Sequence, residues 1–214
     1  MQENLNLHIV KSSELAGKCQ RNWDDEPVDE FDLRTIIDSA MNMPTKQNVK
    51  MYELVVVQDK KAREFLYDSS GVPEFEITDS TRWRNGQMLA PTVLMWFIST
   101  NIPEFHEAED YDISTQHRDS INLNTGISMG AAALTATQLG YNVGFNCCGD
   151  NKLYGQLGRT VNNGFNDYSF ICALGIGKPM KEFSRNIVPK NKNLNIDLTV
   201  ATEEHKKEKT IYYI

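Results

Sequence analysis

Positions 124–145 read NTGISMGAAALTATQLGYNVGF, a helix-like stretch in which most side chains are small. Glycine in a helix interior costs about 1 kcal/mol relative to alanine, so Gly126 and Gly130 need a structural reason. Small residues at four-residue spacing let another backbone approach closely. The stretch is too short and too polar to span a membrane. It therefore predicts a buried helix that packs at close range against another element.

Composition narrows the classes of partner. The net charge is −7 and the sequence pI is about 5.2, with basic residues clustered only at 205–209. Nucleic-acid binders usually present a basic face, so we expect no nucleic-acid partner. No apolar run reaches about 18 residues, and the first residues lack the pattern of a signal peptide. We expect a cytoplasmic protein with no membrane partner.

Alternating strand-like and helix-like segments predict an α+β or α/β layered fold, with 1–214 as one domain. Asp29 is a typical N-cap for the apolar-periodic run that follows it. The other expected helices are 60–68, the small-residue stretch and a short segment from Asp150 to about Gly158. The expected strands are 53–58, 93–100, 141–148, 170–179 and 210–214. The expected irregular stretches are 71–82 and 101–118.

The last five residues, TIYYI at 210–214, end a C-terminal arm that begins at 186. Chain ends usually fray unless they pair with something. Two interpretations stay open. The strand lies at a local sheet edge, or it is exchanged with a second subunit, which would also give the small-residue helix a partner.

No catalytic or metal-binding constellation stands out. The four histidines are scattered, and the cysteines at 19, 147, 148 and 172 lack zinc-site spacing. We expect these cysteines to be buried, reduced thiols. If the chain is an enzyme, a cofactor supplies the difficult chemistry. We therefore predict no catalytic side chain and no metal.

Three stretches, taken in order, resemble the nitroreductase family of FMN-dependent oxidoreductases. They are LAGKCQRNWDDEPV at 15–28, PTKQNVKMYELVVVQD at 44–59 and the helix–strand segment that ends GYNVGFNCCGD. The resemblance implies a nitroreductase-like three-layer α/β/α sandwich with a mostly antiparallel central sheet. It also implies a homodimer, with the small-residue helix at the centre of the interface and the C-terminal strand exchanged between subunits.

By this resemblance, the first stretch binds the phosphate and ribityl chain of FMN. Arg21 matches the family's last basic position, and Cys19 replaces its serine. The leading arginine falls on Gly17, so Lys18 is the nearest substitute charge. The expected phosphate ligands are Arg21, Lys18 and Arg185, because guanidinium and ammonium groups both suit a dianion.

The second stretch resembles a turn that presents polar groups to the flavin bound mainly by the other subunit. Pro44, Thr45 and Asn48 match the family's residues there, and Lys46 is a further expected cofactor-binding residue of this turn. Asn85 and Gln87 resemble amides that lie beside the ring or the ribityl chain. For Asn48, Asn85 and Gln87, ordinary turn chemistry is the alternative.

The third stretch, from Gly144 to Gly149, would lie against the flavin, where its small residues allow close approach. Its expected cofactor-binding residues are Asn146, Cys147, Cys148 and Gly149.

The implied activity passes hydride from NAD(P)H to flavin N5 and then electrons to a small, planar, electron-poor acceptor, such as a nitroaromatic or a quinone. Ping-pong kinetics are expected. Phe105, His106 and Tyr111 would shape the acceptor pocket. Two alternatives stay open. One is another flavin chemistry on the same fold (a dehalogenase, an azoline oxidase or a flavin-fragmenting enzyme), and the other is a dimeric binding protein that has lost its flavin affinity.

Overall fold

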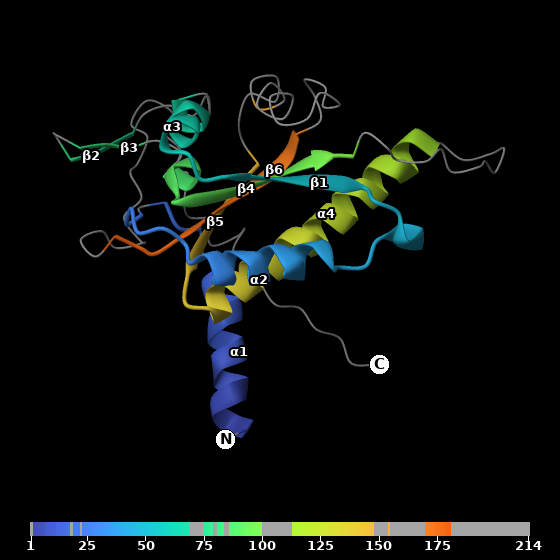
Figure 1. Cartoon of the computed structure of the whole chain (residues 1–214), viewed down its shortest axis with the longest axis horizontal. Helices are drawn as coiled ribbons and strands as arrows, with labels where there is room; N and C mark the ends of the chain where they lie inside the picture. The colour runs from blue at the N-terminus through green and yellow to red at the C-terminus, as the bar shows by residue number, and fades with distance from the viewer. Residues whose placement is uncertain are drawn as a thin grey trace, which may run out of the picture.

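A four-stranded antiparallel sheet lies at the centre of the molecule (Figure 1). The computed structural model describes residues 2–17, 19–21, 23–68, 75–78, 81–83, 86–99, 113–147, 154 and 170–180. The strand order is β1 (Tyr52–Val57), β4 (Thr92–Ile98), β6 (Phe170–Gly177) and β5 (Asn142–Asn146). Each neighbouring pair is antiparallel. Within the described residues, β1 and β5 are therefore the two edges of this sheet.

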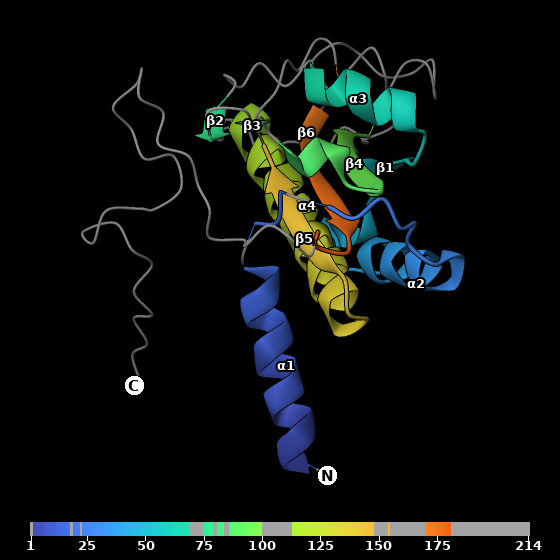
Figure 2. The same cartoon turned by 90° about the vertical axis from the view of Figure 1, so that its left-hand side faces the viewer.

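Helices cover both faces of the sheet. α2 (Glu30–Met41) and α4 (Ile113–Gln138) lie on one face (Figures 1 and 2). α3 (Lys60–Asp68) and the 3₁₀ helix η2 (Gly86–Leu89) lie on the other. The expected three-layer α/β/α arrangement is therefore confirmed.

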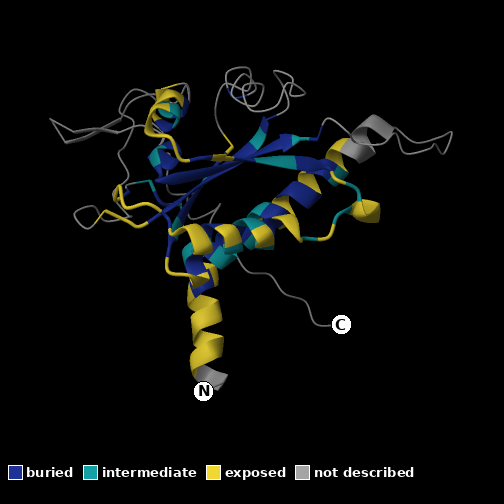
Figure 3. Cartoon of the chain, in the orientation of Figure 1, coloured by how far each residue is buried: buried dark blue, intermediate teal, exposed yellow. Residues whose placement is uncertain are grey.

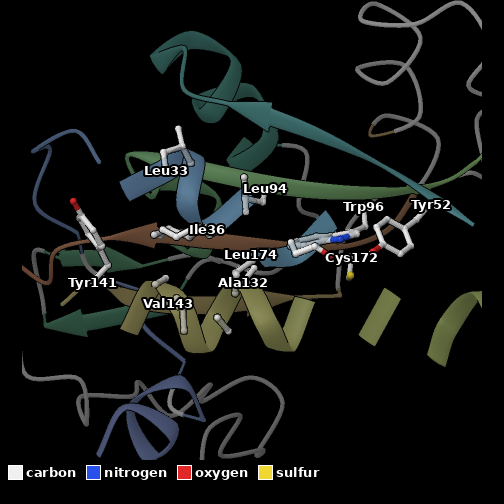
Figure 4. Close-up of a cluster of buried hydrophobic side chains, with 14 of the residues drawn as sticks. Leu33, Ile36, Tyr52, Leu94, Trp96, Ala132, Tyr141, Val143, Cys172 and Leu174 are labelled. Atoms are coloured by element: carbon white, nitrogen blue, oxygen red, sulfur yellow. Dashed lines mark hydrogen bonds between the residues drawn. The ribbon is translucent and has the colours of Figure 1, made fainter. Parts of the chain in front are cut away.

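Alternation along the strands builds a core on each face. Successive side chains of a strand point to opposite sides, so Leu94 and Trp96 of β4 pack with α2 and α4. Met95 and Phe97 of the same strand pack with α3 and η2. Figure 4 shows the first core, in which the Trp96 side chain is fully buried.

The side chain that was expected to cap α2 does so. Asp29 Oδ1 accepts hydrogen bonds from Phe31 N at 2.9 Å and from Asp32 N at 3.2 Å. The Tyr141 hydroxyl donates to Asp32 Oδ2 at 2.8 Å and accepts from Asp29 N at 3.2 Å. Tyr141 thus ties the first turn of α2 to the start of β5.

The small-residue helix α4 is buried on one face only. On that face the Ser128 hydroxyl accepts a hydrogen bond from Trp96 Nε1 at 3.0 Å. Near the end of the helix, the Thr137 hydroxyl donates to Ser12 O at 3.0 Å. A Cβ atom built on Gly126 or Gly130 meets no atom of the described residues within 4 Å. Within one chain this face has no close neighbour, so the close packing expected for the two glycines stays a prediction.

A helix that the sequence pattern does not predict, α1 (Gln2–Ala16), projects from the body of the protein (Figures 1 and 2). Its C-terminal end packs beside α4, and its earlier turns are exposed (Figure 3). Its exposed apolar side chains are Leu5, Leu7, Ile9 and Val10. Their spacing does not follow the helical period, which is why no helix is expected there.

Two stretches that were expected to be irregular contain regular structure. The 71–82 stretch contains β2 (Phe75–Thr78) and the start of β3 (Thr81–Trp83), which pair antiparallel. The 101–118 stretch contains the first turn of α4, which begins at Ile113. Strands this short carry too few residues to show a clear alternation.

Some expected elements lie outside the described residues. The arm 186–214 is one of them, so its strand exchange stays a prediction. Of the expected helix from Asp150 to about Gly158, the structure describes only Tyr154, which is helical. None of the described helices is long and apolar enough to cross a bilayer.

Candidate functional site

The first sequence stretch runs along the outer edge of β5. Gln20 N donates to Val143 O at 2.8 Å, and Cys19 Sγ donates to Phe145 O at 3.5 Å. These contacts join residues that are more than a hundred positions apart in the chain. The structure thus brings the first and third predicted stretches together at one sheet edge.

Gln87, on η2, contacts the same group of residues, Cys19, Gln20, Val143 and Phe145, which we call the β5-edge cluster. Its Nε2 atom donates to Cys19 Sγ at 3.1 Å and to Phe145 O at 3.2 Å. Gln87 is 4% exposed, and its Oε1 atom is buried with no hydrogen-bond partner among the described residues. A buried acceptor without a donor costs about 1–3 kcal/mol, so such an atom indicates a place where a ligand can supply the missing hydrogen.

Two glycines let this cluster form. A Cβ atom on Gly144 would collide with Gln20 O and with the Gln87 side chain, and a Cβ atom on Gly175 would collide with Gln87 O. Any other residue at either position would push the first stretch or η2 off the sheet. The space above Gly144 is filled by the chain itself, so the expectation that this glycine makes room for the flavin is wrong.

Both ends of η2 are held in place. Trp23 Nε1 donates to Gly86 O at 2.6 Å. Arg63 of α3 is buried, and its Nη1 atom donates to Leu89 O at 2.9 Å and to Ala90 O at 3.0 Å. Gln87 therefore sits on a short segment with two fixed ends. The sequence analysis missed the role of Arg63, because an arginine on a short polar helix reads as a surface residue.

Arg21 follows this cluster directly in the chain. Its side chain is half-buried, and its backbone lies so close to Gly86 that a Cβ atom there would collide with Arg21 O. Among the predicted phosphate ligands, Arg21 is the one that falls within the described residues. Arg21, the residue expected at the flavin phosphate, thus follows Gln20 in the chain, beside the edge of β5.

The second predicted stretch lies elsewhere. Pro44, Thr45, Lys46 and Asn48 form the turn that leads into β1, and η1 (Lys46–Asn48) is part of it. β1 and β5 are opposite edges of the sheet and are three strand spacings apart, about 14 Å. The first stretch lies outside β5 and the second lies before β1. One chain does not bring these two groups of residues together.

The turn itself has an unusual backbone. Gln47 and Asn48 both have positive φ, at 56° and 59°, and Asn48 N donates to Thr45 O at 3.0 Å. Left-handed conformations cost about 1–3 kcal/mol for residues other than glycine, although asparagine adopts them more readily than most. Such outliers cluster at functional sites.

At the end of β5, Asn146 is buried and Cys147 is exposed. The prediction of a buried thiol is therefore wrong for Cys147, while it is confirmed for Cys172, and Cys19 is intermediate. Burial, with a smaller contribution from negative charge at Cys147, raises the pKa of Cys172 to about 12.

The remaining predicted site residues lie outside the described part of the chain. They are Lys18, Asn85, Cys148, Gly149 and Arg185, together with the pocket residues Phe105, His106 and Tyr111. Within the described residues, no group of three or more histidine, cysteine, aspartate or glutamate side chains could hold a metal ion.

Similar folds occur among solved structures. NfrA2 from B. megaterium has 19% sequence identity and a TM-score of 0.61, over 83% of this chain and 68% of that chain. A proposed NAD(P)H:FMN oxidoreductase from Staphylococcus epidermidis has 16% identity and a TM-score of 0.60, over 81% of this chain and 89% of that chain. A proposed nitroreductase from Desulfovibrio desulfuricans, in complex with FMN, has 15% identity and a TM-score of 0.59, over 82% of this chain and 88% of that chain.

The sequence itself gives the family. No curated protein sequence matches the chain. The sequence pattern of the nitroreductase family matches residues 18–178. This match spans most of the sequence, from the segment beside β5 to the end of β6. The chain belongs to the nitroreductase family.

Proposed function

We propose that this protein is an FMN-dependent oxidoreductase that works as a homodimer. The observation that carries the proposal is the Gln87 side chain, which is nine-tenths buried with an unpartnered Oε1 atom beside Cys19 at the edge of β5. The family and the similarity to an FMN complex support the choice of cofactor.

The residues at this edge fit FMN. An unpartnered amide oxygen can accept a hydrogen bond from a ring N–H group such as flavin N3–H. Arg21 supplies a guanidinium for the phosphate dianion, in line with the strength of charge-assisted hydrogen bonds. Lys18 and Arg185 would add charge, and Asn85 an amide. When bound, FMN supplies the hydride chemistry at its N5 atom.

A second copy of the chain would complete the site. The turn with Pro44, Thr45, Lys46 and Asn48 is at the opposite sheet edge from Arg21, so in a dimer it would reach the cofactor of the partner. Asn146, Cys147, Cys148 and Gly149 would line the flavin from the chain that binds it.

Exposed apolar surface favours such a dimer. Leu123 of α4 is 65% exposed, and Ile127 lies one turn further along the same helix, beside the open glycines 126 and 130. The apolar side chains of α1 are exposed as well. Apolar surface gathered in this way marks an interaction site more often than it marks free surface. Exchange of the C-terminal strand would add to the same interface.

For the reaction we propose NAD(P)H as the electron donor and a nitroaromatic or a quinone as the acceptor, with ping-pong kinetics. One protein of similar structure is described by its name as a proposed NAD(P)H:FMN oxidoreductase. No side-chain base is needed, because solvent can protonate the reduced acceptor. Phe105, His106 and Tyr111 would limit the size of the acceptor.

A visible absorption spectrum of the purified protein, before and after addition of FMN, tests the cofactor. We expect a bound flavin spectrum that survives gel filtration. Oxidation of NADH and NADPH is then followed with nitrofurazone and with menadione. Flavin binding without nicotinamide oxidation would favour the specialised flavin enzymes. Protein that stays colourless in excess FMN would contradict the proposal and favour a binding protein without flavin.

A further inference from the structure

The ends of β5 and β6 bring two cysteines from distant parts of the chain opposite each other. The last paired residues of β5 and β6 are Asn146 and Ala173. Along an antiparallel pair, one strand advances as the other goes back. Cys147, the residue after Asn146, therefore faces Cys172, the residue before Ala173. The geometry points to a cross-strand dithiol, Cys147–Cys172, that closes reversibly to a disulfide by exchange with a small-molecule disulfide.

The two side chains lie on the same face of the sheet. Phe145 and Leu174 face each other in the register, and both pack in the core under α2 and α4. Cys172 belongs to that core too. Since side chains of one strand alternate between faces, Cys147 shares the face of Phe145. The two thiols therefore point to the same side.

The backbone spacing also suits a disulfide. Val143 O accepts from Gln20 N, and Phe145 O accepts from Gln87 Nε2, so both carbonyl groups point away from β6. The N–H and C=O groups of one residue share a side of the strand, so positions 143 and 145 form non-hydrogen-bonded pairs with β6, and position 147 repeats their geometry.

In such pairs the Cα atoms are about 4.5 Å apart. A disulfide requires a Cα–Cα distance of about 4.4–6.8 Å. A bond between Cys147 and Cys172 can therefore form with little movement of the strands.

The two thiols differ in access, which sets the order of events. Cys147 is exposed, whereas Cys172 is 3% exposed, and both are thiols in the structure. The Cys147 thiolate attacks one sulfur of R–S–S–R, the S–S bond breaks, and one RSH leaves with a proton from solvent. Cys172 then loses its proton and attacks the Cys147 sulfur, and the second RSH leaves. The two cysteines lose two electrons, and the small disulfide gains them.

The second step should be slow at neutral pH. Burial raises the pKa of Cys172 to about 12, so its thiolate is scarce. Below that pKa the thiolate fraction rises about tenfold per pH unit, and the rate of closure should rise with it. The mixed disulfide on Cys147 is thus a measurable intermediate.

The test uses the full chain, reduced and then exposed to oxidised glutathione. Remaining thiols are alkylated, and the protein is digested with trypsin without reduction. Trypsin separates the two cysteines because Lys152 and Arg159 lie between them. We expect a cross-linked peptide pair in mass spectrometry, which grows faster as the pH is raised. No flavin is required, so the result is independent of the proposed function.

Three variants assign the bond. Cys147→Ser at an exposed position should abolish the cross-link, whereas Cys148→Ser should keep it. Cys172→Ala should leave glutathione on Cys147 without further reaction, with its folding checked by circular dichroism. Loss of the cross-link in Cys148→Ser, its persistence in Cys147→Ser, or a bond only between chains would each overturn the proposal. So would a wild-type protein that carries glutathione on Cys147 and never closes.

Discussion

Arg21 is the described residue whose charge the proposed cofactor site depends on most. Replacement by alanine should weaken FMN binding by about 1.5–3 kcal/mol, the size of a hydrogen bond to a charged group. That corresponds to a loss of affinity of roughly ten- to a hundredfold. Titration of the apoprotein with FMN, followed by flavin fluorescence, measures the change.

Two comparisons make this prediction specific. Riboflavin lacks the phosphate, so its affinity should be the same for Arg21→Ala and the wild type. Arg34→Ala removes an exposed arginine of α2 and should leave FMN binding unchanged. If Arg21→Ala binds FMN as the wild type does, the phosphate is held elsewhere.

The raised pKa of Cys172 makes the free energy of unfolding depend on pH. Its pKa is raised by burial from 9.0 to about 12 in the folded chain, so folding favours the neutral thiol. The stabilisation is complete below pH 9 and is lost as the pH rises toward 12, because the unfolded chain ionises first. The slope approaches about 1.4 kcal/mol per pH unit.

Urea unfolding of wild type and Cys172→Ala, both under reducing conditions between about pH 8 and 10, isolates this contribution. The difference in free energy of unfolding between the two proteins should shrink as the pH rises. A constant difference would mean that the thiol ionises as readily in the folded chain as in the unfolded one.

At the level of single residues, sequence reasoning named site members but not their contacts. It singled out Cys19 and Gln87, which the structure joins by a hydrogen bond. That contact spans 68 positions and depends on glycines 144 and 175, whose value lies in the close approach they permit. No local pattern contains this information. The binding roles of these residues stay predictions.

Among the helices, α2 offers the cleanest test of a local signal. Asp29→Ala removes the acceptor for Phe31 N and Asp32 N and should lower the free energy of unfolding by about 1 kcal/mol. Asp29→Asn is the matched control, since asparagine caps equally well. Chemical denaturation measures both. Equal losses in the two variants would assign the effect to charge and not to capping.

Helices and strands with a clear periodicity of apolar residues were predicted, and those without one were missed. The 60–68 helix has the predicted bounds, and β1, β4 and β6 lie within two residues of the predicted strands. α1 was missed because its apolar residues are exposed and do not repeat with the helical period. The β2–β3 pair was missed because its strands are four and three residues long.

For the whole molecule, the exposed face of α4 that carries Gly126 and Gly130 predicts where the two subunits of the dimer meet. Gly130→Leu adds a side chain where no atom of the described part of the chain lies within 4 Å. Leucine favours a helix by roughly 1 kcal/mol over glycine. The folded chain should therefore be at least as stable, while the proposed dimer should dissociate. Light scattering after gel filtration measures the mass across a dilution series.

Glu64→Leu is the control for this experiment. Glu64 is exposed on α3, on the opposite face of the sheet, so the wild-type mass should be retained. A wild-type protein that is monomeric at all concentrations would contradict the proposed dimer, and so would Gly130→Leu with the mass of a dimer.

The placement of the two predicted binding stretches at opposite sheet edges has a genetic consequence. Two alleles, Arg21→Ala and Asn48→Ala, would each harm a different edge of the same chain. In a heterodimer made from both products, one flavin site would contain intact Arg21 and intact Asn48. The other site would contain both substitutions. Co-expression should therefore rescue activity that neither allele supports alone, as intragenic complementation.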